Sequence, residues 1–186
     1  MEIFKFGGTS LASSEAIRHL VHIIKEYKPS GEPLIVVVSA LNNTTDKLNT
    51  ALERAVTADA DYLSPLEDIK SYHKSIANDL FPGEQLPEIV GNINLLVKEG
   101  VNILNGLHLI REITPKAKDQ VLSIGERISA MLIAAYMQLH TKETQWFDAT
   151  QLIRMHAKTR EVDLPESRER LKEAMENCNG IGVMAG

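Results

Sequence analysis

Short apolar runs alternate with longer segments of helical periodicity along this chain. The runs at residues 2–6, 34–38, 120–122, 145–147 and 181–184 predict strands, and the second has the continuous β-branched character of a strand buried on both faces. Between the strands, apolar residues recur every three or four positions, which predicts helices. We expect helices over residues 13–27, 44–56, 65–80, 87–110, 123–139 and 166–177, and a small extended piece over 152–155. The alternation indicates an α/β fold with a mostly parallel sheet flanked by helices.

The two longest helical segments lie next to each other, between strands. Pro82 and Gly83 interrupt them, so we expect a helical hairpin packed on the domain rather than a separate domain. A chain of 186 residues has the length of one domain and buries about two thirds of the surface that its unfolded form exposes. The sequence therefore predicts a single domain over residues 1–186.

The amino-acid composition narrows the kinds of partner that we expect this protein to bind. The 25 acidic side chains outnumber the 20 basic ones, giving a net charge of -5, so we expect neither nucleic acid nor membrane as a partner. The single cysteine, Cys178, has no partner for a disulfide and no ligand neighbours at metal-binding spacing. No targeting signal precedes Gly7. We predict a reduced, cytoplasmic protein without a metal site of its own.

The richest candidate chemistry follows the first predicted strand, in the stretch Lys5-Phe6-Gly7-Gly8-Thr9-Ser10. Glycines let a backbone approach a phosphate closely, consecutive N–H groups can converge on an anion, and a lysine adds positive charge. The lysine precedes the glycines, unlike in a Walker loop. A strand, a Gly-Gly turn and a hydroxyl cap also form an ordinary junction between a strand and a helix, so this stretch alone leaves both interpretations open.

Two further polar clusters are expected at strand ends. Ser39 ends the second strand shortly before Thr44 and Thr45, and Ser123, Glu126 and Arg127 follow the third. Carboxyl ends of parallel strands share one edge of a sheet, where small molecules bind. Each cluster has a structural alternative, because S-x-x-E is also a helix capping box and a threonine is also an ordinary N-cap.

Taken together, three blocks of sequence resemble the amino-terminal part of aspartate kinases, members of the amino-acid kinase superfamily. They are Lys5-Phe6-Gly7-Gly8-Thr9-Ser10, then Val37-Val38-Ser39-Ala40 with Thr44-Thr45-Asp46-Lys47-Leu48, and finally Leu122-Ser123-Ile124-Gly125-Glu126-Arg127-Ile128-Ser129-Ala130. The resemblance implies the amino-terminal half of a carbamate-kinase-like three-layer sandwich. It extends over essentially the whole chain and is weakest from Tyr62 to Pro115.

The resemblance also implies a reaction, the transfer of the γ-phosphoryl group of ATP to the β-carboxylate of L-aspartate. This reaction opens the route to lysine, methionine and threonine. Lys5 would stabilise the charge of the transferring phosphoryl group, and residues 7–10 would cradle it. The acceptor carboxylate is already ionised at neutral pH, so no general base is needed. Mg²⁺ would arrive held mainly by the nucleotide.

For the acceptor, Glu126 is the natural partner of the aspartate ammonium group. The resemblance implies that Ser39 and Thr45 hydrogen-bond the substrate, with Thr45 preferred over Thr44 for its spacing from Ser39. Arg127 is either a carboxylate clamp or one half of a structural ion pair. The full-length enzyme is expected to be a homo-oligomer.

The chain departs from the family in two ways. Where aspartate kinases commonly have an arginine and a Thr-Asp pair, it has Thr150 and His156, so any role at those positions is in doubt. The family's nucleotide-binding half and regulatory ACT domains have no counterpart in residues 1–186, so we expect this stretch alone to be inactive. The alternatives are a stand-alone binding or assembly module, and a kinase of the same superfamily for another acceptor.

Overall fold

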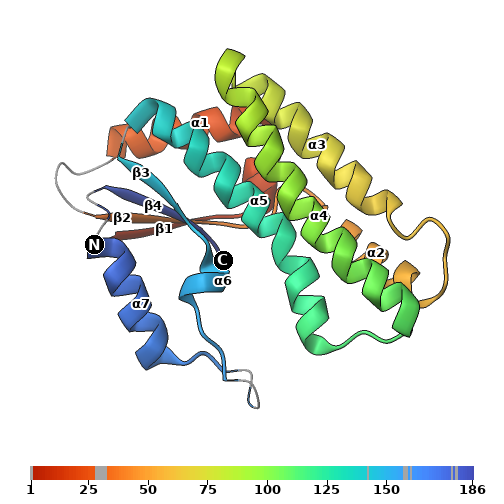
Figure 1. The fold of residues 1–186 in the computed structure, drawn as a ribbon. Coiled ribbons are helices and arrows are strands. Elements are labelled where there is room, and N and C mark those ends of the chain that lie inside the picture. Colours follow the sequence, from red (N-terminus) through yellow and green to blue (C-terminus); the bar gives the residue numbers. More distant parts are fainter. Residues whose placement is uncertain are drawn as a thin grey trace.

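A computed structural model describes residues 2–27, 33–141, 143–156, 159, 161–176, 178 and 180–186. Within this part of the chain, the strands form one parallel sheet in the order β1-β2-β4-β3 (Figure 1). They are β1 (Glu2–Phe6), β2 (Leu34–Val38), β3 (Thr144–Phe147) and β4 (Ile181–Ala185). The two central strands, β2 and β4, are almost wholly buried, whereas edge strand β1 alternates between half-buried and exposed positions. Because all strands are parallel, their carboxyl ends share one edge.

Helices cover both faces of the sheet (Figure 1). On one face, α1 (Ser14–Tyr27) and α5 (Pro115–Thr141) share a hydrophobic core with Val36 and Val183 of the central strands. On the other face, α7 (Leu164–Glu176) packs near Ile35 and Met184 in a second, smaller cluster. Successive side chains of a strand point to opposite faces, so both central strands supply apolar side chains to both layers. The predicted α/β architecture is confirmed.

The predicted helical hairpin is present and lies beside the sheet (Figure 1). It consists of α3 (Ser64–Leu80) and α4 (Leu86–Ile110), joined through the short 3-10 helix η2 (Gly83–Gln85). The hairpin packs against α2 (Thr44–Val56) and α5, and its buried side chains belong to the larger hydrophobic core. None of the helices in the described ranges is long and apolar enough to cross a membrane.

The predicted strand at residues 120–122 is wrong, because these residues lie inside α5. This helix begins eight positions before Ser123, at Pro115, and the Thr114 hydroxyl accepts a hydrogen bond from the Ala117 N–H at 3.2 Å. A threonine before a proline is a helix-start signal, since Thr caps the first N–H groups and Pro needs no donor there. Only Val121 and Leu122 of this run are apolar, which is too short a pattern to indicate a strand.

Ser123 consequently does not cap a helix. It lies two turns into α5, where its hydroxyl donates to the carbonyl oxygen of Gln120 at 2.8 Å. Glu126 and Arg127 are therefore mid-helix side chains, not groups at a strand end. They reach the carboxyl edge of the sheet because α5 crosses it, and that crossing positions the candidate site.

The segment after β3 differs in detail from the expected extended piece at 152–155. Residues Ala149–Leu152 form a single helical turn, α6, and Met155 makes an isolated antiparallel bridge with Val162. The predicted helix 166–177 corresponds to α7, and its expected last residue, Asn177, lies outside the described residues.

Candidate functional site

Lys5 and the glycines lie at the carboxyl end of β1. Lys5 is an exposed residue near the end of the strand, and the chain then passes through Gly7 into the 3-10 helix η1 (Gly8–Leu11). The Ser10 N–H donates to the Gly7 carbonyl oxygen at 3.0 Å, and fully buried Leu11 anchors the turn. Any role of the Ser10 amide in a phosphate cradle would require this bond to break.

Gly8 is where this turn meets the end of β2. A Cβ atom on Gly8 would lie 2.1 Å from the carbonyl oxygen of Ala40, and the Gly8 carbonyl accepts from the Asn42 N–H at 3.4 Å. One rung earlier, the Ser39 N–H donates to the Phe6 carbonyl at 3.3 Å. The two loops are thus joined by backbone contacts that only glycine permits at position 8.

The loop from β2 to α2 separates the two threonines by environment. Thr44 is buried, and its hydroxyl donates to the Leu41 carbonyl oxygen at 2.6 Å. Thr45 is exposed in the first turn of α2, where helix N–H groups lack helical acceptors. Asn42 has a φ of 51°, a left-handed conformation that asparagine tolerates. The Thr44 hydroxyl is therefore engaged in a hydrogen bond within the fold, whereas Thr45 is exposed to solvent.

Helix α5 comes close to the same loop at Gly125. A Cβ atom there would lie 2.7 Å from Cγ2 of Thr44 and 3.2 Å from Cβ of Ala40. One turn further, the buried Ser129 hydroxyl donates to the Ser39 carbonyl oxygen at 2.9 Å. These contacts bring Glu126, which lies between them in sequence, to the end of β2.

Glu126 and Lys5 interact electrostatically across the site. Burial raises the pKa of Glu126 above the usual range of a carboxyl group, and the positive charge of Lys5 opposes this shift. These residues are 121 positions apart in the sequence, and the fold brings their charges close enough to interact. A half-buried carboxylate beside an ammonium group at the carboxyl edge of a parallel sheet can bind a small zwitterion or a ligand of mixed charge.

Arg127 points into an ion-pair cluster. Its Nη1 donates to Glu99 at 2.8 Å, and its Nε and Nη2 lie 3.2 Å from Oδ2 of Asp148. Oδ1 of the same aspartate accepts from the N–H of Thr150 at 3.0 Å and from its hydroxyl at 2.7 Å. The cluster ties α4, α5 and the start of α6 together. These contacts are those expected if Arg127 is one half of a structural ion pair. Its role as a clamp for a substrate carboxylate stays a prediction.

The structure therefore brings together Lys5, the glycine turn, Ser39, Thr45 and Glu126, although the functional role of each stays a prediction. Sequence reasoning did not single out three residues that help to build the site, namely Ser129, Asn42 and Asp148. Ser129 lies in the third matching block, so its position was available as a signal. Asn42 and the contact of Asp148 with Arg127 carried no signal, because the partners Gly8 and Arg127 are distant in sequence, although Asp148 before α6 is also a local helix cap.

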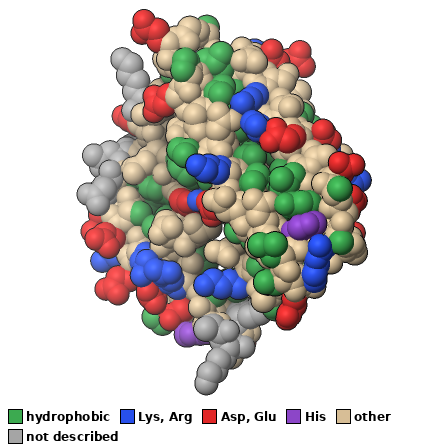
Figure 2. Space-filling view, turned by 45° about the vertical axis from the view of Figure 1, so that its right-hand side comes forward, with side chains coloured by type: hydrophobic (Ala, Val, Ile, Leu, Met, Phe, Trp, Pro, Cys, Tyr) green, Lys and Arg blue, Asp and Glu red, His purple; other side chains and the backbone are tan. Residues whose placement is uncertain are grey.

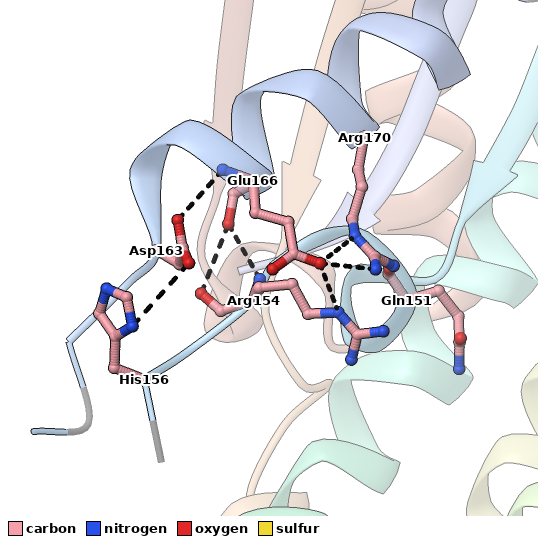
Figure 3. Close-up of polar contacts among 7 residues, drawn as sticks. Gln151, Arg154, His156, Asp163, Glu166 and Arg170 are labelled. Atoms are coloured by element: carbon pink, nitrogen blue, oxygen red, sulfur yellow. Dashed lines mark hydrogen bonds and ion pairs between the residues drawn. The ribbon is translucent and has the colours of Figure 1, made fainter. Parts of the chain in front are cut away.

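The segment that departs from the family pattern is held by its own polar contacts (Figure 3). Glu166 lies 2.7 Å from Nη2 of Arg170 and 3.6 Å from Nε of Arg154. His156, expected to be solvated, has an exposed side chain whose Nδ1 lies 3.8 Å from Oδ2 of Asp163. These residues fasten the chain after α6 to the start of α7.

On the face drawn in Figure 2, the basic and acidic side chains of the described residues are interspersed with hydrophobic ones. Within the described ranges, no group of three or more His, Cys, Asp or Glu side chains is arranged to hold a metal ion. Cys178 is a free, buried thiol.

The fold and this edge of the sheet define a class of protein. The sequence model of the amino acid kinase family matches residues 1–186, so the chain belongs to this family.

Its relatives within the family are aspartokinases, as the sequence blocks predicted. Chloroplastic bifunctional aspartokinase/homoserine dehydrogenase 1 of Arabidopsis thaliana is 29% identical over 174 residues, covering 92% of this chain and 19% of that protein. Chloroplastic aspartokinase 3 of the same plant is 31% identical over 153 residues, covering 81% and 26%.

The solved structure of E. coli aspartokinase III in complex with aspartate and ADP matches all of this chain and 40% of that one. Its TM-score is 0.79 at 22% identity, which establishes the shared fold. The chain thus spans about a quarter or less of the length of these curated relatives.

Proposed function

We propose that the protein containing these residues is an aspartate kinase, which transfers the γ-phosphoryl group of ATP to the β-carboxylate of L-aspartate. The observation that carries the proposal is the electrostatic interaction of Lys5 with the half-buried Glu126, next to the glycine turn and Ser39. Similarity to proteins named aspartokinases, one of them solved with aspartate and ADP, favours this acceptor within the family.

The proposed reaction needs charge neutralisation and alignment more than covalent catalysis. The bond between the γ-phosphorus and its bridging oxygen breaks, a carboxylate oxygen of aspartate bonds to that phosphorus, and ADP leaves with the electron pair. No proton is transferred, because the attacking carboxylate is already ionised. Lys5 would offset the negative charge shared between donor and acceptor. Mg²⁺ would be supplied with the nucleotide.

Glu126 would bind the ammonium group of aspartate, and its ionisation is a condition for that contact. Burial favours the neutral carboxyl group, and Lys5 favours the carboxylate. Lys5 would therefore act twice, on the phosphoryl group and on the charge of Glu126. Ser39 and Thr45 would hydrogen-bond the substrate from the β2–α2 loop, with the exposed Thr45 hydroxyl better placed than the occupied Thr44 hydroxyl.

Substitution of Lys5 tests the proposal in the full-length enzyme. We expect Lys5→Ala to lower kcat by about 100-fold or more, because a charge that stabilises the transition state is lost. Lys70→Ala, which removes a lysine paired with Glu67 on α3, should leave kcat unchanged. Aspartate kinase activity mostly retained in Lys5→Ala would contradict the assignment.

We further propose that residues 1–186 contribute the acceptor side of the site and do not bind ATP tightly by themselves. The small share of the relatives' length that they span supports this proposal. A calorimetric titration of the 186-residue chain with Mg-ATP measures it directly. Micromolar binding of the nucleotide would show that the chain already holds a complete donor site.

A further inference from the structure

A cleft lies along the second half of α5, outside the candidate site. It has a volume of about 400 Å³ and lies between the second half of α5, the beginning of α4 and edge strand β3. On α5 its lining begins at Met131, five positions or about 7.5 Å along the helix from Glu126, and none of the candidate-site residues lines it. The cleft is therefore separate from the candidate site.

The floor of this cleft is apolar and its rim is polar. Phe81, Ile89 and Met131 are buried side chains that line it, whereas Gln138 and Gln145 are exposed. Clefts of a few hundred Å³ with an apolar lining and a few polar groups are typical of sites for small molecules. A ligand here would place an apolar stem on the floor and a polar head at the rim.

The charge of the rim selects the head group. Among the described residues that line the cleft, Glu88 is the only ionisable one, and the other polar groups are uncharged amides, a hydroxyl and an indole. Glu88 is exposed, and no described cation forms an ion pair with it. The lining therefore carries a net negative charge, which favours a cation over an anion.

Trp146 adds a second feature that suits a cation. It also lines the cleft, and an indole ring is the aromatic group that attracts ammonium ions most strongly. Its Nε1 atom is buried without a hydrogen-bond partner among the described residues, so no such bond fixes the ring in place. The ring itself is partly buried and packs against the larger hydrophobic core.

We propose that this cleft binds a small organic cation, an ammonium group on a stem of a few carbons. The ammonium group pairs with the Glu88 carboxylate, the stem covers Ile89 and Met131, and Trp146 contacts the bound cation. This assignment rests on the cleft alone and is independent of the kinase activity proposed above.

The chain offers a specific reporter, because Trp146 is its only tryptophan. Trp146 emission of the 186-residue chain is followed while n-propylammonium chloride, sodium propionate or 1-propanol is added at constant ionic strength. We expect a saturable change with propylammonium, with a Kd in roughly the millimolar range for so small a probe. Propionate and propanol should give no saturable change. An equal response to propionate would overturn the proposal.

Matched variants separate the site from general charge effects. Glu88→Gln should weaken propylammonium binding at least about 10-fold, because it removes the ionised partner and keeps the shape. Glu84→Gln makes the same change at an exposed residue outside the cleft and should leave binding unaltered. Circular dichroism spectra that match the parent chain establish that both variants fold. Unchanged affinity in Glu88→Gln would contradict the assignment.

A second copy of the chain is the competing occupant, since β3 is an edge strand. Sedimentation velocity and Trp146 emission are measured over a range of protein concentrations without amine. A monomeric chain with constant emission supports the small-molecule site. Self-association that shifts the emission would show that a protein interface closes the cleft, and the proposal would then be wrong.

Discussion

The two consecutive glycines after β1 carry different constraints. Gly8 lies against the end of β2, where its missing Cβ atom would be 2.1 Å from the Ala40 carbonyl oxygen. Gly7 has no heavy atom within 4 Å of the equivalent position and an ordinary φ of -77°. Gly8 is therefore required by the packing of the fold, and Gly7 leaves open space in front of the turn.

This difference predicts opposite outcomes for two identical substitutions. Gly8→Ala should lower the free energy of unfolding by about 1–3 kcal/mol, because a backbone carbonyl cannot move aside as a flexible side chain does. Gly7→Ala should change it by no more than about 0.5 kcal/mol. Urea denaturation of the 186-residue chain measures both values. Similar free energies for the two variants would refute the role assigned to Gly8.

At the residue scale, the sequence indicated candidate residues but not their contacts. It favoured Thr45 over Thr44 from spacing, and the structure shows Thr44 buried with its hydroxyl occupied. It could not choose between the two interpretations of Arg127. The partners of that arginine, Glu99 and Asp148, lie 28 and 21 positions away and reach it only through the packing of α4 and β3 on α5.

At the element scale, the strands and helices that were long or bounded by clear signals were predicted well. The exception is α5, in which residues 120–122 were predicted as a strand and residues 115–119 were assigned to no element. The helical spacing of Val121, Ile124 and Ile128 was present in the sequence, as was the Thr114-Pro115 start signal. A run of three residues is too short to distinguish a strand from one turn of a helix. The convergence of the Glu126 block with β2 depends on a helix crossing.

The crossing of α5 over α2 depends on Gly125. Gly125→Ala should destabilise the chain by roughly 1–2 kcal/mol, although alanine is the better helix former, because its Cβ atom would lie 2.7 Å from Cγ2 of Thr44. Gly106→Ala on α4 meets no atom within 4 Å and should stabilise by up to about 1 kcal/mol. Thermal and urea unfolding of both variants give the comparison.

A second substitution identifies the clash as the cause. Thr44→Ser removes Cγ2 and keeps the hydroxyl that donates to the Leu41 carbonyl. Combined with Gly125→Ala, it should recover most of the lost stability, which is a coupling between contacting residues. If the two effects simply add, the crossing is not limited by this contact and the packing account of Gly125 fails.

At the scale of the whole molecule, the helical layer contains a fully buried ionisable side chain that is expensive to charge. His73 on α3 is fully buried, and its Nδ1 lies 2.7 Å from the Ile69 carbonyl oxygen. Since a carbonyl can only accept, Nδ1 carries the proton of the neutral ring. Its Nε2 atom is buried without a partner among the described residues. Protonation would put a charged N–H where no described acceptor lies, so folding keeps this histidine neutral.

The free-energy cost of protonating His73 in the folded chain appears in the pH dependence of global unfolding. Burial lowers the pKa of His73 from 6.5 to about 4, against the opposing effect of the Ile69 hydrogen bond. As the pH falls below 6.5, the unfolded chain takes up a proton that the folded chain refuses, so this contribution to stability is lost progressively until about pH 4. The loss approaches 1.4 kcal/mol per pH unit and totals roughly 3 kcal/mol. His73→Gln should flatten urea-measured stability over this range, and His22→Gln at an exposed residue of α1 is the matched control substitution. Equal slopes in the parent chain and His73→Gln would mean that other groups govern the acid response.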